Sequence, residues 1–130
     1  LELHGNLGRV KCFAEGRVIP EADWVLGEGV PRCPRCNALL RPDVVWFGET
    51  LPANTFRRAE RACREADIVF SVGTSGLVPP AATLPVTAIE AGAIGVEVNL
   101  EATYLAELFA YGLYGPSGVI LPALVAAVWG

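Results

Sequence analysis

Three of the four cysteines lie in one stretch of the chain, at spacings that suit a metal ion. Cys33 and Cys36 form a C-x-x-C pair, in which two thiolates can hold one tetrahedral zinc from a tight turn. Cys12 lies upstream, and Glu15 stands three residues after it, where a second such pair would have its other cysteine. Because a carboxylate oxygen can also bind zinc, the spacing predicts either three thiolates with one carboxylate or a degenerate site that holds metal poorly.

The only histidine of the chain is His4, in the segment His-Gly-Asn. Histidine is the side-chain type whose unperturbed pKa lies near neutrality, so His4 is the natural candidate for a general base. A lone histidine is more often structural than catalytic, and the residue by itself leaves both roles open.

A candidate nucleotide site follows two apolar runs. Gly73, Thr74 and Ser75 come directly after the first run, and Asn99 follows the second. Ligands of open α/β sheets bind at the carboxyl ends of the strands, where a glycine lets the backbone approach a phosphate or ribose and hydroxyls can donate hydrogen bonds. The pattern predicts one half of a nucleotide site, because no G-x-G-x-x-G segment occurs in these residues.

Helices and short apolar runs alternate in the second part of the chain. The residues from Pro52 predict a helix with an arginine-rich face and an apolar face. The apolar face consists of Phe56, Ala59, Cys63 and Ala66. Apolar runs predict buried strands at 68–72 and 94–98, and further helices are expected at 80–91, 101–111 and 121–128. This alternation is typical of a parallel sheet.

The residues before that helix have their own pattern. Arg41-Pro42 predicts a turn, and the β-favouring residues 44–47 predict a strand that ends sharply at Gly48. Residues 12–42 are rich in glycine, proline and charge, and a stretch without a core of its own needs a metal to stabilise it. The predicted fold class is α/β: a partial Rossmann-like parallel sheet, residues 1–11 and 43–130, with an inserted small zinc-ribbon-like module, residues 12–42.

Composition narrows the class of protein. With 130 residues, 52% of them apolar, and a net charge of −4, the chain is expected to form a globular domain that binds neither nucleic acid directly nor a membrane. The uncharged stretches 68–89 and 108–130 contain too many glycines and prolines for membrane helices.

No basic N-terminal region precedes an apolar one, so a cytoplasmic protein with reduced thiols is expected. The chain begins at Leu1 and contains no methionine, from which we expect a piece of a longer protein.

Six motifs in order along the chain resemble those of the sirtuins, a family of NAD-dependent protein-lysine deacylases. The motifs are LELHGN, CPRC, LLRPDVVWFGETLP, ADIVFSVGTSGLV, EVNLE and GPSGVILP. The resemblance implies that His4 is the catalytic base, which accepts a proton relayed from the ribose hydroxyls of NAD after nicotinamide leaves. The acyl group would pass from the lysine of a protein or peptide to ADP-ribose.

The resemblance also implies the binding residues. NAD would be held by Gly73, Thr74, Ser75, Asn99, Leu100, Glu101 and Ser117, the last of these near the adenine. The acyl-lysine strand would pair with backbone flanked by Val45, Trp46, Phe47, Gly48 and Val78. A structural zinc would be held by Cys12, Cys33 and Cys36, with Glu15 where the family has a fourth cysteine.

The sequence departs from the sirtuin pattern at two residues and lacks the N-terminal half of the sirtuin sequence, and both facts bear on its function. Besides Glu15, Pro79 stands where the family commonly has tyrosine, and the glycine-rich NAD loop of the family is not in this sequence. We therefore expect the isolated chain to be inactive as a deacylase and to expose an apolar face. A protein ADP-ribosyltransferase and a non-catalytic binding module built on a degenerate zinc ribbon are the alternatives.

Overall fold

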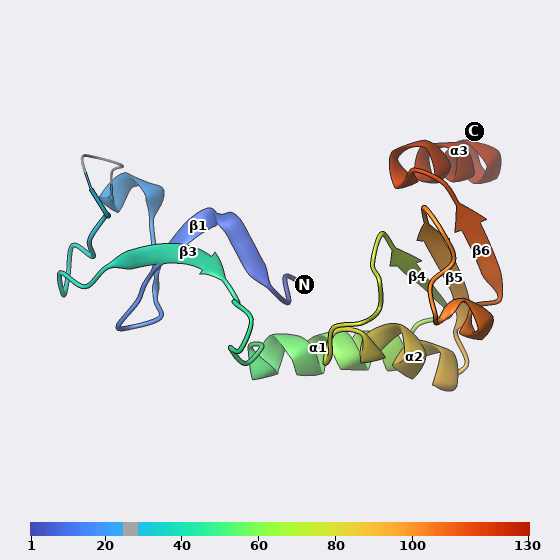
Figure 1. Cartoon of the computed structure of the whole chain (residues 1–130), viewed down its shortest axis with the longest axis horizontal. Coiled ribbons are helices and arrows are strands. Elements are labelled where there is room, and N and C mark those ends of the chain that lie inside the picture. The colour runs from blue at the N-terminus through green and yellow to red at the C-terminus, as the bar shows by residue number, and fades with distance from the viewer. Residues whose placement is uncertain (25–28) are drawn as a thin grey trace. The chain divides into compact units, whose positions relative to one another are not determined.

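The computed structural model describes residues 1–24 and 29–130 (Figure 1). The chain divides into two compact units, Leu1–Thr55 and Phe56–Gly130. The predicted division into residues 1–11 with 43–130 and an inserted module of residues 12–42 stays a prediction.

The first unit contains an antiparallel sheet in the order β2-β1-β3. Its strands are β1 (Gly5–Cys12), β2 (Val18–Ile19) and β3 (Leu40–Val44), and a short 3-10 helix, η1, spans Glu21–Asp23. The buried core of the unit is small and contains two thiols. It consists of Cys12, Ile19, Cys33 and Leu40, with Val10, Trp24 and Ala38 packed against it. So small a core fits the expectation that this part of the chain needs a metal.

Strand β3 lies earlier in the chain than predicted. The predicted strand at 44–47 and the predicted turn at Arg41-Pro42 are both wrong, because β3 runs from Leu40 to Val44 and contains Arg41 and Pro42. Pro42 pairs with Val10 of β1. Since β3 is an edge strand of its sheet, the missing N–H of proline is tolerated there.

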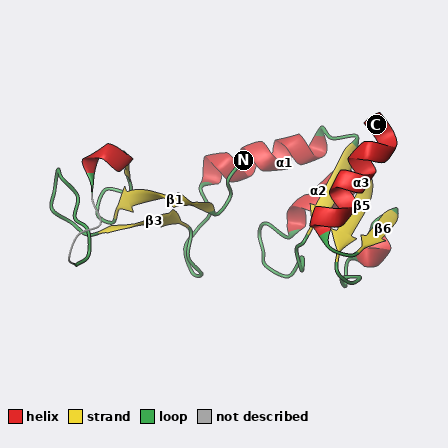
Figure 2. Cartoon of the chain, turned by 90° about the horizontal axis from the view of Figure 1, so that it is seen from above, coloured by secondary structure: helices red, strands yellow, loops and turns green. Residues whose placement is uncertain are grey.

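The second unit contains a parallel sheet in the order β4-β5-β6. Its strands are β4 (Ile68–Val72), β5 (Ile94–Asn99) and β6 (Tyr111–Tyr114). Helix α2 (Thr83–Glu90) packs against β4 and β5, and α3 (Ser117–Trp129) packs against β5 (Figure 2). This arrangement confirms the predicted α/β class with a parallel sheet.

The helices differ from the prediction mostly at their bounds. Helix α1 (Ala53–Arg64) begins directly after Pro52, as predicted. Helix α2 begins at Thr83, so Pro85 falls in its first turn, where a missing N–H leaves no bond unmade. Helix α3 begins at Ser117 rather than at residue 121.

The helix predicted at 101–111 is wrong. The structure has a short 3-10 helix, η2 (Ala106–Leu108), followed by β6. The backbone of β6 pairs with β5, for example Tyr111 opposite Val96. The four residues of β6 are few and include a glycine, which weakens the local strand signal of the two tyrosines, so this strand depends on pairing with a neighbour that is remote in sequence.

The expected exposed apolar face is confirmed on β4, at the edge of its sheet. Alternate residues Ile68, Phe70 and Val72 are between 39 and 52% exposed. Among the residues that the structure describes, no helix is both long and apolar enough to cross a membrane.

Candidate functional site

The structure brings three thiols together in the first unit. The Sγ atoms of Cys12, Cys33 and Cys36 all lie within 4.8 Å of one another, and those of Cys12 and Cys36 are 3.4 Å apart. Two thiolates on one tetrahedral zinc, each about 2.3 Å from the ion, lie about 3.8 Å apart. The three thiols therefore fit three corners of a tetrahedral zinc site.

Two turns with the same hydrogen-bond pattern supply these thiols. In each turn, the N–H of the first cysteine donates to the carbonyl five residues later, and its carbonyl accepts from the N–H four residues later. These bonds join Cys12 to Arg17 and Gly16, and Cys33 to Ala38 and Asn37. The fifth residue of each turn has a positive φ, 66° at Gly16 and 60° at Asn37. Glu15 thus occupies the place in its turn that Cys36 occupies in the other.

Glu15 lies beside the thiols without joining them. Its N–H donates to Cys12 Sγ at 3.4 Å, whereas its carboxylate pairs with Arg17 Nε at 3.5 Å. The carboxylate is outside the group of ligand atoms that lie within 4.8 Å of one another. The structure therefore assembles three of the four predicted ligands, and the role of Glu15 stays a prediction.

Backbone amides prepare Cys33 for a metal. Amide N–H groups of Cys36 and Arg35 point at the thiol and lower the pKa of Cys33 to about 7. The backbone amide of Ala38 also lowers the pKa of Cys36. The hydrogen bond with the Cys12 thiol and burial outweigh this effect, so the pKa of Cys36 is raised to about 11. Since the thiolate is the metal ligand, Cys33 is more easily ionised at neutral pH than Cys36.

The His-Gly-Asn segment lies directly against the end of β3. The N–H of Val45 donates to the carbonyl of His4 at 2.9 Å, and Gly5 pairs with Val44. Gly5 has a φ of +82°, and a Cβ there would collide with the carbonyl oxygen of Asp43. Only glycine therefore allows this approach. The side chain of His4, directly before β1, is exposed.

The predicted substrate segment, Val45 to Gly48, runs into an exposed turn after β3. Phe47 is 95% exposed at this turn, and Gly48 has a φ of +88°. The turn therefore offers backbone and an aromatic side chain to a partner. Val78, the other predicted substrate residue, is also exposed.

A cavity of about 310 Å³ lies at the carboxyl ends of the strands of the second unit. It is lined by Gly73, Val98, Asn99, Leu100, Gly115, Pro116, Ser117 and Gly118. A Cβ added at Gly73 or Gly118 would meet no protein atom within 4 Å. These glycines thus leave room for a ligand at the edge of the sheet where α/β proteins bind nucleotides.

Four of the seven predicted NAD-binding residues line this cavity, namely Gly73, Asn99, Leu100 and Ser117. Thr74, Ser75 and Glu101 are not among the lining residues. Sequence reasoning missed Val98, Gly115, Pro116 and Gly118, although the glycines on both sides of Pro116-Ser117 were a visible signal. Ser117 is also the first residue of α3, and the N–H groups of a helix N-terminus favour an anion.

Side chains at and after the end of β5 hold the turn that follows β4, at the rim of the cavity. The Asn99 side-chain amide donates to the carbonyl of Thr74 at 2.8 Å, and its Oδ1 accepts from the N–H of Leu100 at 2.9 Å. The Tyr104 hydroxyl donates to the carbonyl of Gly76 at 2.6 Å. Asn99 thus links the turn after β4 to the end of β5.

A buried carboxylate supports the same region from within. Glu97 of β5 is 1% exposed, and it accepts hydrogen bonds from the Thr103 hydroxyl, the Thr103 N–H at 3.4 Å and the Tyr114 hydroxyl at 3.2 Å. Thr103 follows the cavity residues of β5, and Tyr114 precedes those of α3. Glu97 therefore joins the two segments between which the cavity opens.

Replacement of Glu97 by leucine is expected to lower the free energy of unfolding by about 1–3 kcal/mol, because the Thr103 and Tyr114 donors lose their acceptor. Urea denaturation of the whole protein measures this change. Glu107→Gln, on the exposed face of η2, is the control and should change it by less than about 0.5 kcal/mol. Equal stability of the Glu97→Leu protein and the wild type would contradict this role.

Comparison with known proteins identifies the family. The model of the Sir2 family matches residues 1–80. The chain belongs to the Sir2 family. The NAD-dependent protein deacylase of Pyrococcus furiosus is 45% identical over 130 residues, which cover 96% of this chain and 52% of that protein. The deacylase of Pseudomonas putida is 47% identical over 134 residues, which cover 98% of this chain and 51% of that protein.

Solved Sir2 structures share the fold. A Sir2 homologue in complex with NAD has a TM-score of 0.89 and 37% identity, and the match covers 97% of this chain and 49% of that one. A Sir2–p53 peptide–NAD+ complex has a TM-score of 0.83 and 32% identity, covering 96% of this chain and 53% of that one. The chain thus spans about half the length of the Sir2 proteins that it matches.

Proposed function

We propose that the chain is part of an NAD-dependent protein-lysine deacylase that removes an acyl group from lysine, with release of nicotinamide. The observation that carries this proposal is the glycine-lined cavity at the carboxyl ends of the parallel sheet, in a chain of the Sir2 family. A Sir2 homologue of the same fold binds NAD. Bound NAD would supply the ADP-ribose that receives the acyl group.

The residues that line the cavity would hold the nucleotide. Gly73 allows close approach of the ligand to the turn after β4, and the N-terminus of α3 at Ser117 favours a phosphate or a polar base edge. Thr74, Ser75 and Glu101, which are not among the lining residues, would add contacts from the same strand ends, as the family resemblance implies.

His4 would act as the general base and accept the proton of a ribose hydroxyl. Its exposed side chain is free for this role, because it is the main-chain carbonyl of His4 that bonds to Val45. The extended backbone of an acyl-lysine peptide would pair with the segment from Val45 to Gly48 and with the backbone near Val78, as an added strand. A Sir2 relative has been solved with a p53 peptide, which supports a protein or peptide substrate.

A structural zinc would be held by Cys12, Cys33 and Cys36. Their geometry fits three corners of a tetrahedral site, and a bound ion would stabilise the small core that contains two of these thiols. All four cysteines are free thiols, as metal binding requires, and the reducing cytoplasm is the compartment that we propose for the protein.

The test is NAD-dependent nicotinamide release from an acetylated lysine peptide by the full-length protein. We expect turnover that needs both NAD and the acyl group, whereas the isolated 130-residue chain is expected to give none, since it spans about half of its relatives. Release of nicotinamide with transfer of ADP-ribose to protein would favour the ADP-ribosyltransferase alternative. Stable peptide binding without turnover would favour the binding module.

A further inference from the structure

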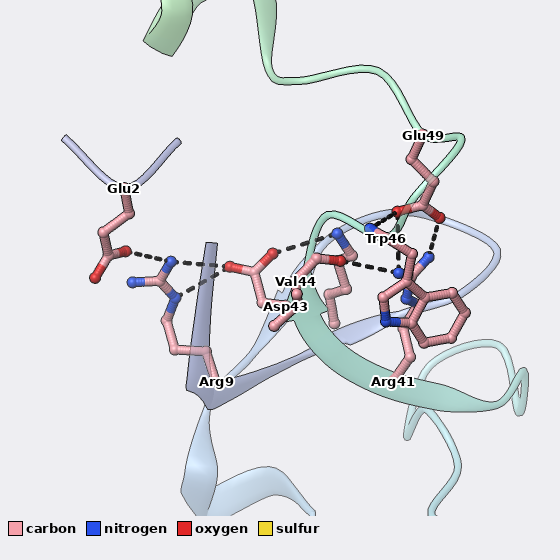
Figure 3. A network of polar contacts seen from close by, with 8 residues as sticks. Glu2, Arg9, Arg41, Asp43, Val44, Trp46 and Glu49 are labelled. Carbon is pink, nitrogen blue, oxygen red and sulfur yellow. Dashed lines mark hydrogen bonds and ion pairs between the residues drawn. The ribbon is translucent and has the colours of Figure 1, made fainter. Parts of the chain in front are cut away.

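Arg41 holds the turn after β3 through several groups at once (Figure 3). Its guanidinium forms a two-pronged pair with the Glu49 carboxylate, in which Nη1 donates to Oε1 and Nη2 donates to Oε2 at 3.0 Å. Nη2 also donates to the carbonyl of Val44 at 2.9 Å. The guanidinium lies over the Trp46 ring, 3.5 Å from the centroid of that ring. The Arg41 side chain is only 10% exposed.

Glu49 completes the arrangement from the other end of the turn. Its Oε2 accepts from the N–H of Trp46 at 2.9 Å, and its own N–H donates to the carbonyl of Trp46 at 3.0 Å. Residues 44–49 are therefore closed into a loop by one guanidinium and one carboxylate. The Phe47 side chain adds little packing to this order, because it is almost fully exposed.

Charge keeps the pair intact over a wide pH range. The Arg41 guanidinium and the Trp46 amide lower the pKa of Glu49 to about 2, from an ordinary value of 4.5. A lowered folded-state pKa means that the stability from this pair is complete above about pH 4.5 and is lost as the pH falls toward 2. At neutral pH the turn is therefore held by a fully ionised, two-pronged pair, the strong kind of charge-assisted bond.

We propose that Arg41 and Glu49 are positioning residues for the acyl-lysine substrate: they pre-order the turn whose backbone, from Val45 to Gly48, pairs with the peptide. This inference rests on the proposed function and goes beyond it, because neither side chain is assigned a contact with NAD or with the acyl group. A peptide that pairs with this backbone binds best when the backbone is already ordered, because binding then does not have to order it. Without the pair, binding would have to order the loop first, and affinity for the peptide would fall.

The test compares Arg41→Lys and Glu49→Gln with wild type in the full-length protein. Lysine keeps the charge but cannot form the two-pronged pair, so the KM for the acyl peptide is expected to rise about tenfold, the effect of losing one charged hydrogen bond. The KM for NAD should stay unchanged, because the cavity residues belong to other elements. Arg9→Lys is the matched control: Arg9 pairs with Glu2 and with Asp43 of β3, and its hydrogen bonds and ion pairs do not reach residues 44–49 (Figure 3).

Hydrogen–deuterium exchange at the Trp46 and Glu49 amides reports the turn itself, without turnover. Both amides are bonded within the turn, so we expect faster exchange in both turn variants and wild-type exchange in Arg9→Lys. Unchanged exchange in the two turn variants would overturn the proposal. Faster exchange would also overturn it if the KM for the peptide stayed unchanged, or if the KM for the peptide and the KM for NAD rose equally. A wild-type protein without turnover would reject the proposed function instead, and exchange would still decide whether Arg41 orders the turn.

Discussion

Replacement of His4 by alanine is expected to abolish measurable deacylation by the full-length protein while leaving its fold intact. General bases contribute about 10²- to 10⁴-fold to the rate, and no other histidine occurs in this chain to replace His4. The fold should survive because the contact of His4 with Val45 uses the main-chain carbonyl, which alanine keeps. The fall should therefore appear in kcat, with an unchanged melting temperature.

The measurement is nicotinamide release at saturating NAD and acetylated peptide, together with thermal unfolding of the same samples. Leu7→Ala is a suitable control, since Leu7 is an exposed residue of β1, the strand that directly follows His4, and the change should leave both quantities near wild type. Turnover at the wild-type rate by His4→Ala would remove this residue from the mechanism. A loss of turnover with a large fall in melting temperature would show a structural role instead.

Replacement of Cys12 by alanine is expected to release the metal and to unfold the first unit. Cys12 is fully buried, belongs to the small core, and its thiol lies within 4.8 Å of the other two. Structural zinc contributes about 10–16 kcal/mol of apparent binding free energy in small zinc modules, far more than a core of this size supplies. Zinc content per chain and thermal unfolding measure the effect. Cys63→Ala, on helix α1 outside the cluster, should leave the zinc content unchanged and lower the melting temperature far less.

Adding a cysteine at position 15 tests the same metal site, because it should strengthen zinc binding rather than weaken it. Because Glu15 holds the place in its turn that Cys36 holds in the other, Glu15→Cys is expected to add a fourth thiolate at a ready position. Zinc affinity in competition with a chelator should rise by about tenfold or more, equal to about 1.4 kcal/mol. Weaker zinc binding in Glu15→Cys would show that the two turns are not equivalent toward a metal.

The parallel sheet was largely predictable because its strands carry their own local signals. The apolar run at 68–72 is followed by glycine, and β4 has those bounds. Strand β6 was missed because its four residues have a glycine among them and become a strand only by pairing with β5. Strand β3 was misplaced because Arg41-Pro42 is a turn signal by local rules, whereas an edge strand accepts proline.

The candidate site was predictable where one short turn carries the chemistry. Cys33 and Cys36 are three residues apart, so one tight turn is enough to bring their thiols together. The roles of His4 and of the substrate segment stay predictions. The support that Glu97 gives to the cavity was not visible in the sequence, because its hydroxyl partners, Thr103 and Tyr114, are six and 17 residues away.

The amino-acid sequence by itself determined the alternation of helix and strand, the zinc-type turn of Cys33 and Cys36, and the glycine turn at Gly73, since each depends on neighbours within a few residues. Only the tertiary structure decided that the Glu15 carboxylate lies outside the thiol cluster, that Arg41 closes a loop with Glu49, and that Gly5 lies against Asp43. The physical reason is the distance along the chain over which each interaction acts. Backbone propensities and turn geometry act along a few peptide units, whereas ion pairs, strand pairing and cavities depend on which remote segments meet once the chain has folded.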